Sequence, residues 1–290
     1  MSATPLTWGG RSIPAPGGLP AVAVSLTGPS LAQARSQARS AIDAGADVLE
    51  LRVDLLEETG ALAAPDPLDA ATAAAQVLEC LRGLGEIIAA DGADAGAGAP
   101  LLLTCRTAAE GGRAHLDDTA YGSLLRSVLD GLTDWTPERR PAAIDVEVQR
   151  GCLPQVCAQA HALSIDVVAS SHDFEATPAD EALEEVLARM AREGADLAKI
   201  AVWPTTADDV ARLLGVCARA TAGAGEGADL GVPVAAMSMG ALGAVSRVAP
   251  AFGSALTFAV VPDGQGQSRA SAPGQLPLQD VRRCLELLRA

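Results

Sequence analysis

The feature that most constrains the fold of this chain is the alternation of short apolar runs with longer alanine-rich segments. Eight runs of six or seven residues are rich in Val, Ile, Leu and Ala and are predicted to be strands: 21–26, 47–52, 100–105, 142–148, 166–171, 197–202, 233–238 and 255–260. The segments between and after them predict helices at about 30–44, 68–90, 119–131, 153–162, 179–192, 206–220, 241–248 and 277–289. Strands that alternate with helices form parallel β/α units.

Eight such units predict an α/β fold, the (β/α)8 TIM barrel, as a single domain over residues 1–290. A doubly wound open sheet is the alternative. That fold would usually carry a glycine-rich phosphate turn after its first strand, where this chain has only SLTGPS. The barrel is therefore preferred.

Three segments lie outside the repeating units. Residues 1–20 end in RSIPAPGGLP and predict a turn-rich or hairpin cap before the first strand. Two low-complexity stretches, GADAGAGA (92–99) and AGAGEGADLG (222–231), each precede a strand. Helix-to-strand loops lie at the N-terminal face of a barrel, away from the chemistry, so we expect these insertions to be functionally neutral.

Composition narrows the classes of partner. Only 2% of residues are aromatic, which leaves no stacking surface for single-stranded nucleic acid. The net charge of −15 disfavours polyphosphates and anionic membranes, but not a small anion held by a few local cations. No apolar run approaches 18 residues, and no cationic segment leads into one, so we expect neither membrane insertion nor secretion. Six scattered cysteines and three dispersed histidines predict reduced thiols, no metal site and a cytoplasmic protein.

Charged side chains gather where the predicted strands end, and these ends build the active site of a barrel. Five strands contribute them, and a glycine-rich segment at 264–275 follows the last strand. In chain order the side chains are Glu50, Arg52, Asp54, Arg106, Glu110, His172, Asp173, Lys199 and Arg247. Structural salt bridges could explain one such pair but are a poor explanation for all of them.

Lys199 lies inside the apolar strand LAKIAV, where a lysine must pair, reach solvent or serve a function. Partly desolvated and crowded by Arg106 and Arg247, its ammonium would be disfavoured and its pKa lowered. A Schiff-base nucleophile needs that state. The alternative is a salt bridge with Glu50 or Glu110.

His172 ends a strand in SSHDF, which favours a general base over a structural histidine. His115 and His161 lack such a setting and are expected to be structural or exposed. Glu50 and Arg52 are two residues apart and share one face of a strand. They could clamp substrate hydroxyl and carboxylate groups, or form an intrastrand charge pair.

Two further features point to an anion at the mouth of the barrel. Arg247 has the fork geometry that suits a carboxylate, although a surface helix arginine is an equal alternative. Ser271 and Gln275 flank a Pro-Gly turn in the segment 264–275, which is either a plain linker or a lid that excludes water.

Six segments together resemble the type I 3-dehydroquinate dehydratases of the shikimate pathway, which serves aromatic amino-acid biosynthesis. They occur in family order from about residue 20 to the end of the chain: ELRVD (50–54), TCRTAAEGG (104–112), ASSHDF (169–174), AKIAVWP (198–204), SMGALGAVSR (238–247) and ASAPGQ (270–275). Each alone is weak, but six in order are highly specific.

The resemblance implies roles for the matching positions. Lys199 would form an imine with the ketone of 3-dehydroquinate, His172 would act as the base, and Glu110 would lie near it. The substrate would be bound by Ser25, Glu50, Arg52, Arg106, Arg247, Ser271 and Gln275, with the last three holding its carboxylate. The family works without metal or organic cofactor and is commonly dimeric, so we expect a homodimer. A leucine at position 51, where an aromatic is expected, and the insertions depart from the family.

Two other readings remain. A class I aldolase barrel would share the lysine, but would normally need a phosphate cradle after its last two strands, where this chain has SMGALG and a Ser/Gln loop. A catalytically silent barrel would have lost the lysine, the histidine or an arginine, and this chain retains them all.

Overall fold

The structure is a computed structural model that describes residues 4–63, 69–91, 99–222, 230–262 and 270–289. The eight predicted strands are present, each within two residues of its expected bounds. They are β3 (Ala21–Leu26), β4 (Val48–Arg52), β5 (Leu101–Thr104), β6 (Ala143–Glu147), β7 (Asp166–Asp173), β8 (Leu197–Val202), β9 (Val234–Ser238) and β10 (Leu256–Val260).

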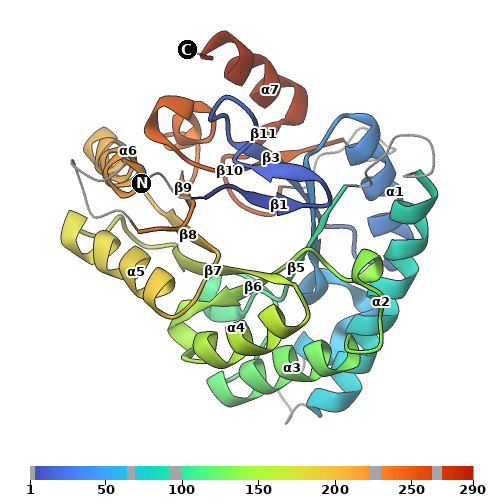
Figure 1. The fold of residues 1–290 in the computed structure, drawn as a ribbon. Coiled ribbons are helices and arrows are strands. Elements are labelled where there is room, and N and C mark those ends of the chain that lie inside the picture. Colours follow the sequence, from blue (N-terminus) through green and yellow to red (C-terminus); the bar gives the residue numbers. More distant parts are fainter. Residues whose placement is uncertain (1–3, 64–68, 92–98, 223–229, 263–269, 290) are drawn as a thin grey trace.

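These strands form a parallel sheet in sequence order, in which β10 pairs back onto β3. A short strand, β11 (Leu276–Pro277), adds to the far edge of β10. The ring is closed between β9 and β10, where the Ala255 N–H donates to the Val234 carbonyl at 2.7 Å. Figure 1 shows the strands as a central ring with the helices outside it. The predicted barrel is confirmed.

Among the described residues, seven α-helices surround the ring. They are α1 (Leu31–Asp43), α2 (Ala70–Asp91), α3 (Asp118–Gly131), α4 (Leu153–Ala162), α5 (Asp180–Arg192), α6 (Ala207–Thr221) and α7 (Leu278–Leu287). Short 3-10 turns occupy 53–55, 57–63, 108–110, 137–139, 148–150, 244–248 and 250–252. Within the described residues, no helix is long and apolar enough to cross a bilayer.

The α-helix predicted over 241–248 is wrong. Two 3-10 turns, Ala244–Val248 and Pro250–Phe252, stand in its place. The chain enters this region through Gly240, whose φ of 70° lies in the left-handed region. Gly243 then packs so close to the Ser238 carbonyl that a Cβ there would approach it to 2.3 Å. Only six residues separate Gly243 from Pro250, too few between two helix breakers for a stable α-helix.

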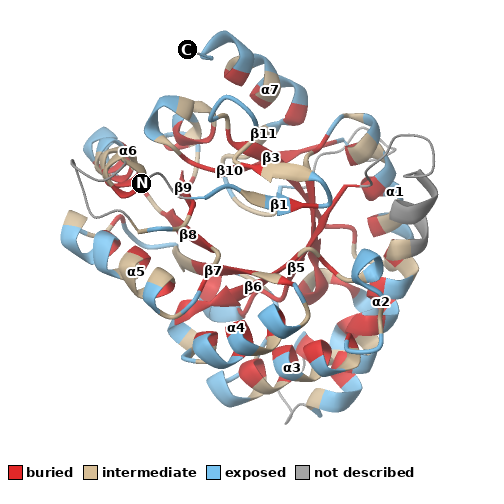
Figure 2. Ribbon diagram, viewed as in Figure 1, coloured by how far each residue is buried: buried red, intermediate tan, exposed pale blue. Residues whose placement is uncertain are grey.

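Alternation along each strand sorts the side chains into two cores. In β8, Ala198 and Ile200 belong to the core between sheet and helices, whereas Leu197 and Ala201 belong to the core inside the ring. Lys199 lies between these last two and therefore faces the lumen. Figure 2 shows the buried strands and the buried inner faces of the helices.

The N-terminal segment forms the predicted hairpin, with β1 (Leu6–Trp8) paired to β2 (Arg11–Ile13). Trp8 and Ile13 are fully buried among the lumenal residues at the N-terminal ends of the strands, including Ala143 and Leu197. The Trp8 Nε1–H donates to Asp166 at 2.8 Å. The hairpin therefore fills the N-terminal end of the barrel, opposite the mouth. Most of both Ala/Gly insertions (92–98 and 223–229) lies outside the described residues, so their predicted neutrality stays a prediction.

Candidate active site

A cleft of about 510 Å3 opens at the C-terminal end of the strands. Its lining combines charged and polar groups with the apolar side chains of Ala201, Met237, Met239 and Phe258. The polar lining residues are Glu50, Arg52, Arg106, Glu110, His172, Lys199, Arg247, Ser271 and Gln275. These are nine of the ten site residues predicted from the sequence. The tenth, Ser25, lies one hydrogen bond away.

Lys199 is 3% exposed, and its amine lies inside the barrel. The Nζ donates to Asp145 Oδ2 at 2.7 Å and lies 5.0 Å from the centre of the Phe258 ring. The salt bridge that the sequence suggested with Glu50 or Glu110 is therefore formed with Asp145 instead. Lys199 is also the only lysine among the 21 Lys and Arg residues of the chain. An arginine keeps its proton near neutral pH, whereas a lysine amine can release one, so this is the one side chain of the sequence that can supply a nucleophilic amine.

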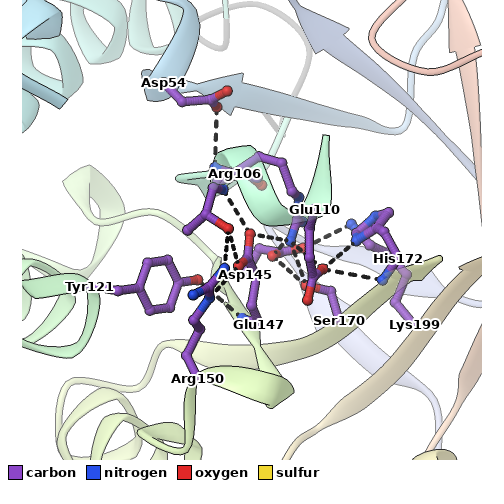
Figure 3. A network of polar contacts seen from close by, with 12 residues as sticks. Asp54, Arg106, Glu110, Tyr121, Asp145, Glu147, Arg150, Ser170, His172 and Lys199 are labelled. Atoms are coloured by element: carbon purple, nitrogen blue, oxygen red, sulfur yellow. Dashed lines mark hydrogen bonds and ion pairs between the residues drawn. The ribbon is translucent and has the colours of Figure 1, made fainter. Parts of the chain in front are cut away.

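Arg106 is held within a buried carboxylate cluster, which Figure 3 shows from close by. Its guanidinium donates to Asp145 at 2.6 Å, to Ser170 at 2.9 Å and to Glu147 at 3.1 Å, and lies 3.4 Å from Glu110. Burial opposes the charge on Arg106, but the attraction of Asp145, Glu147 and Glu110 outweighs it and raises the pKa of Arg106 well above its usual value. Arg106 lines the cleft with most of its donors already directed at the protein.

Asp145 and Glu147 project from β6 into the lumen, two residues apart. Burial acts to raise the pKa of Asp145, but the nearby charges of Arg106 and Lys199 outweigh it and hold that pKa below its usual value. Glu147 accepts hydrogen bonds from the Thr107 backbone and hydroxyl at 2.8 and 2.6 Å and from Arg150 at 3.0 Å. Both carboxylates are thus fully buried acceptors for buried cations.

His172 lies near the mouth on β7, which continues two residues beyond its predicted end, and its side chain is 12% exposed. Its Nδ1 lies 2.8 Å from Glu110 Oε2, which also accepts from the His172 backbone N–H at 3.1 Å. Burial lowers the pKa of His172 well below its usual value, and Arg106 and Lys199 add to that effect. Burial, opposed by Arg106 but reinforced by Glu147 and Asp145, raises the pKa of Glu110 to about 8.

This pairing prepares His172 to act as a base. When Nδ1–H donates to Glu110, the Nε2 atom keeps its lone pair, and the lowered pKa keeps the ring neutral at pH 7. Phe174 stacks on the imidazole, with ring centroids 6.5 Å apart and planes 22° apart, and also lines the cleft.

Glu50 and Arg52 share the lumenal face of β4, as their spacing predicts, but they do not form a charge pair with each other. Glu50 accepts from Ser25 Oγ and, at 3.0 Å, from Thr104 Oγ1. Arg52 instead makes a two-pronged pair with Asp54, with both N···O distances at 2.7 Å. Leu51 points away into the outer core, so the leucine at this position leaves the cleft unchanged.

Arg247 is 2% exposed, so it is not a surface arginine. Its Nη2 donates to the Pro273 carbonyl at 3.1 Å, its Nε has no hydrogen-bond partner, and among the described residues no carboxylate pairs with it. Burial lowers the pKa of Arg247 to about 10. A buried guanidinium with free donors that faces a cleft is a binding site for a small anion.

The segment after β10 borders the same side of the cleft. Ser271 Oγ donates to Ser25 Oγ at 2.8 Å, and Gln275 bonds to both the backbone and the hydroxyl of Ser271, at 3.0 and 2.9 Å. The Gly240 N–H donates to the Pro273 carbonyl at 3.2 Å, and the β10–β11 pairing begins at Leu276. Residues 270–275 are therefore fixed against the barrel mouth. The predicted lid also includes 264–269, which lie outside the described residues.

Three residues of this site were not predicted as functional: Asp145, Glu147 and Ser170. Asp54 was expected among the charged strand-end side chains, but no role was assigned to it. The signal for two of them was present, because AIDVE places acidic residues at alternate positions of an apolar strand, as LAKIAV does for the lysine. Both side chains project from within β6 and not from the loop that follows it. A second signal in the sequence is its single lysine.

Comparisons with known proteins agree with this geometry. Residues 22–290 match the family model described as type I 3-dehydroquinase. The 3-dehydroquinate dehydratases of Lactiplantibacillus plantarum and Salmonella agona are each 36% identical over 276 residues, covering 93% of this chain and 93% and 94% of theirs.

Solved structures give the same result. The 3-dehydroquinate dehydratase of Geobacillus kaustophilus superposes with a TM-score of 0.79 at 29% identity, over 99% of this chain and 97% of its own. The type I enzyme of Clostridium difficile, described with covalently modified comenic acid, has a TM-score of 0.79 at 28% identity, over 99% and 98%.

Proposed function

The chain belongs to the type I 3-dehydroquinases, and from that membership we propose that its barrel mouth dehydrates 3-dehydroquinate to 3-dehydroshikimate through a Schiff base on Lys199. Dehydration of 3-dehydroquinate is a step of the shikimate pathway, and the Schiff base is characteristic of type I enzymes. The observation that carries the assignment to these residues is the chain's only lysine, buried at the base of the cleft with His172 and Arg247 around it.

Binding of the substrate would begin at a charged group of the cleft that has no ion-pair partner among the described residues. The substrate carboxylate would meet the Arg247 guanidinium, supported by the hydroxyl of Ser271 and the amide of Gln275. The ring would lie against Met237 and Phe258, with its hydroxyls towards Glu50 and Arg52. This orientation brings the ketone to Lys199.

The reaction then proceeds through an imine. Once the Lys199 amine has lost its proton, its lone pair attacks the ketone carbon, and the ketone oxygen leaves as water. The cationic imine withdraws electrons from the neighbouring C–H bond. His172 Nε2 removes that proton and an enamine forms; the β-hydroxyl then takes up the proton from His172 and departs as a second water. Hydrolysis of the imine returns one water and releases the conjugated ketone, so one water is lost overall.

Reduction during turnover tests this proposal. Borohydride added with 3-dehydroquinate should trap one covalent adduct, detected by intact mass and located by peptide mapping on Lys199. Because the chain has no other lysine, the only competing amine is the terminal one. The Lys199→Ala variant is the control, and it should lose both the adduct and the rise in enone absorbance. An active wild-type enzyme without any adduct would contradict the proposal.

We also propose that residues 1–290 act as one domain, in the cytoplasm and as a homodimer. The support is the family's usual assembly together with the six cysteines, which are all free thiols and mostly buried. Light scattering on the purified protein tests the dimer. A monomeric mass at micromolar concentration would contradict it.

A further inference from the structure

Asp145 is a buried carboxylate that contacts the reacting atom of the site but has no step in the reaction described above. Its Oδ2 accepts from Lys199 Nζ at 2.7 Å, and its Oδ1 accepts from Arg106 at 2.6 Å and from the Ser170 hydroxyl at 2.7 Å. No part of its side chain is exposed. In Figure 3 it lies within the network that joins Arg106 to Lys199.

The charges in this cluster assign Asp145 to Lys199. Arg106 also contacts Glu147, at 3.1 Å from its Nη1, but Glu147 is shared with Arg150, which lies 3.0 Å away. Glu110 does not offer a full negative charge at neutral pH, since its pKa is raised to about 8. Three cations, Arg106, Arg150 and Lys199, therefore surround Asp145 and Glu147, and Asp145 is the carboxylate within contact of the Lys199 nitrogen.

The strand register places the Asp145 carboxylate nearer the N-terminal end of the barrel than the strand position beside Lys199. Lys199 is in register with Ser170 on β7, which is in register with Glu147 on β6. The lysine nitrogen nevertheless pairs with Asp145, one lumenal position nearer the hairpin-filled end of the barrel. A substrate entering from the mouth meets the nitrogen from the side opposite this carboxylate. One N–H can thus keep pointing at Asp145 while the nitrogen bonds to the substrate.

The charge at the nitrogen is the same before and after imine formation. An ammonium and a ketone, R–NH3+ and O=CR2, give R–NH+=CR2 and water. The new C=N bond uses the nitrogen electron pair, and the C–O electrons leave with the oxygen, which takes two of the three ammonium protons. The cation and one N–H remain. A fixed carboxylate that matches the ammonium therefore also matches the iminium.

We propose that Asp145 is the counterion of the Lys199 iminium and keeps that intermediate protonated during turnover. This inference rests on the proposed function, because it presupposes an imine on Lys199. Only the protonated imine is an effective electron sink, so the population of this form limits proton abstraction by His172. By stabilising the cation, Asp145 also makes the C–H bond next to the iminium less acidic. Its net benefit is therefore confined to the pH range in which an imine without a counterion would be neutral.

The proposal predicts that the pH at which kcat falls on the alkaline side of its pH profile depends on the charge of Asp145. Two unit charges about 4 Å apart at an effective dielectric of about 20 shift an iminium pKa by roughly two to three units. Asp145→Asn removes the charge while keeping the shape, so the alkaline limb of kcat should fall by about that amount. Other titratable or charged side chains around the pair stay in place: Glu50 and Arg52 on β4, Arg106 and Glu110 after β5, Tyr121 on α3, Glu147 on β6 with Arg150 after it, His172 on β7 and Arg247 after β9.

The experiment compares Asp145→Asn with Ser170→Ala across pH 5.5–10 (roughly the range in which the fold and the assay survive). Ser170→Ala removes one donor to the same carboxylate but keeps its charge. The readouts are kcat and the rate of cyanoborohydride trapping, which reports the protonated imine. Asp145→Asn should lower the pH of the alkaline limb in both, while Ser170→Ala should leave the limb within about half a unit of wild type, whatever its maximal rate. An unmoved limb in Asp145→Asn would overturn the proposal.

Failure of the counterion role and failure of the proposed function give different results. If wild type gives no adduct with 3-dehydroquinate, the Schiff base itself is wrong. If wild type gives the adduct but the Asp145→Asn limb does not move, only the counterion is wrong. Should Asp145→Asn not fold, the wild-type iminium pKa is compared with that of a free imine of 3-dehydroquinate and propylamine. A wild-type value equal to or below the free one overturns the proposal, and a higher value supports it.

Discussion

Arg247 is expected to weaken the fold and to strengthen substrate binding, and replacing it should separate the two effects. The side chain is 2% exposed, donates one hydrogen bond to the Pro273 carbonyl and has no carboxylate partner among the described residues. Arg247→Met keeps an unbranched side chain in the same space and removes the charge. We expect this variant to be at least as stable as wild type and far less active.

The magnitude follows from the pKa. Burial lowers the pKa of Arg247 from 12.5 to about 10, and each unit corresponds to about 1.4 kcal/mol. Because the unfolded chain binds this proton more tightly, the charged form costs the folded protein about 3 kcal/mol at every pH below about 10. Loss of the Pro273 hydrogen bond offsets about 1 kcal/mol and imperfect packing a little more. Arg247→Met should gain about 1–2 kcal/mol, or about 2–4 °C in Tm.

Activity should move in the opposite direction. Removing one partner of a buried, charge-assisted pair costs about 3–5 kcal/mol, so kcat/KM for 3-dehydroquinate should fall by about 10² to nearly 10⁴. Thermal unfolding and the enone absorbance assay on the same preparation measure both effects. Arg113→Met, at an exposed arginine in the loop after β5, is the matched control and should change neither much. An Arg247→Met protein that loses stability, or that keeps its kcat/KM, would refute the reasoning.

Two further predictions concern the base and its partner. His172→Ala should reduce kcat by about 10²-fold or more while still allowing an adduct on Lys199. The control is His161→Ala, at an exposed histidine paired with Asp196, which should turn over normally. Equal rates in both variants would exclude the role of His172. Glu110 has a folded pKa of about 8 against 4.5 when free, so its contribution to stability is present below pH 4.5 and is lost as pH rises to about 8. The Tm of wild type relative to Glu110→Gln should therefore fall between pH 5 and 8, and a constant difference would contradict this.

The barrel was predictable because each strand repeats one simple pattern. Apolar runs of strand length between helical segments identify the units, and a period of two decides which side chains face the lumen. Those two rules placed Lys199, Glu50 and Arg52 inside the ring, as the structure confirms. The prediction of a helix over 241–248 was wrong. Its apolar residues suggested a helix, but Gly243 and Pro250 leave too few residues between them.

The pairing inside the ring was not predictable in the same way. Sequence spacing shows that a side chain faces the lumen but not which of its neighbours it meets, because that depends on the stagger between strands. Lys199 pairs with Asp145, two strands away, rather than with Glu50 or Glu110. Arg52 pairs with Asp54, beyond the end of its own strand. For Lys199 the missing information was the register between strands, and for Arg52 it was the 3-10 turn at Val53–Leu55 that brings Asp54 back to it.

The position of Lys199 has a consequence for how the protein meets reactive small molecules. Every other basic side chain is an arginine or a histidine, and the one ε-amine is 3% exposed at the base of a cleft. Sugars, aldehydes and activated esters that modify surface lysines on most proteins would find no other lysine side chain on this chain. Amine-directed reagents thus become probes of a single site, and an electrophile small enough to enter the cleft would act as a selective inactivator from which bound substrate protects.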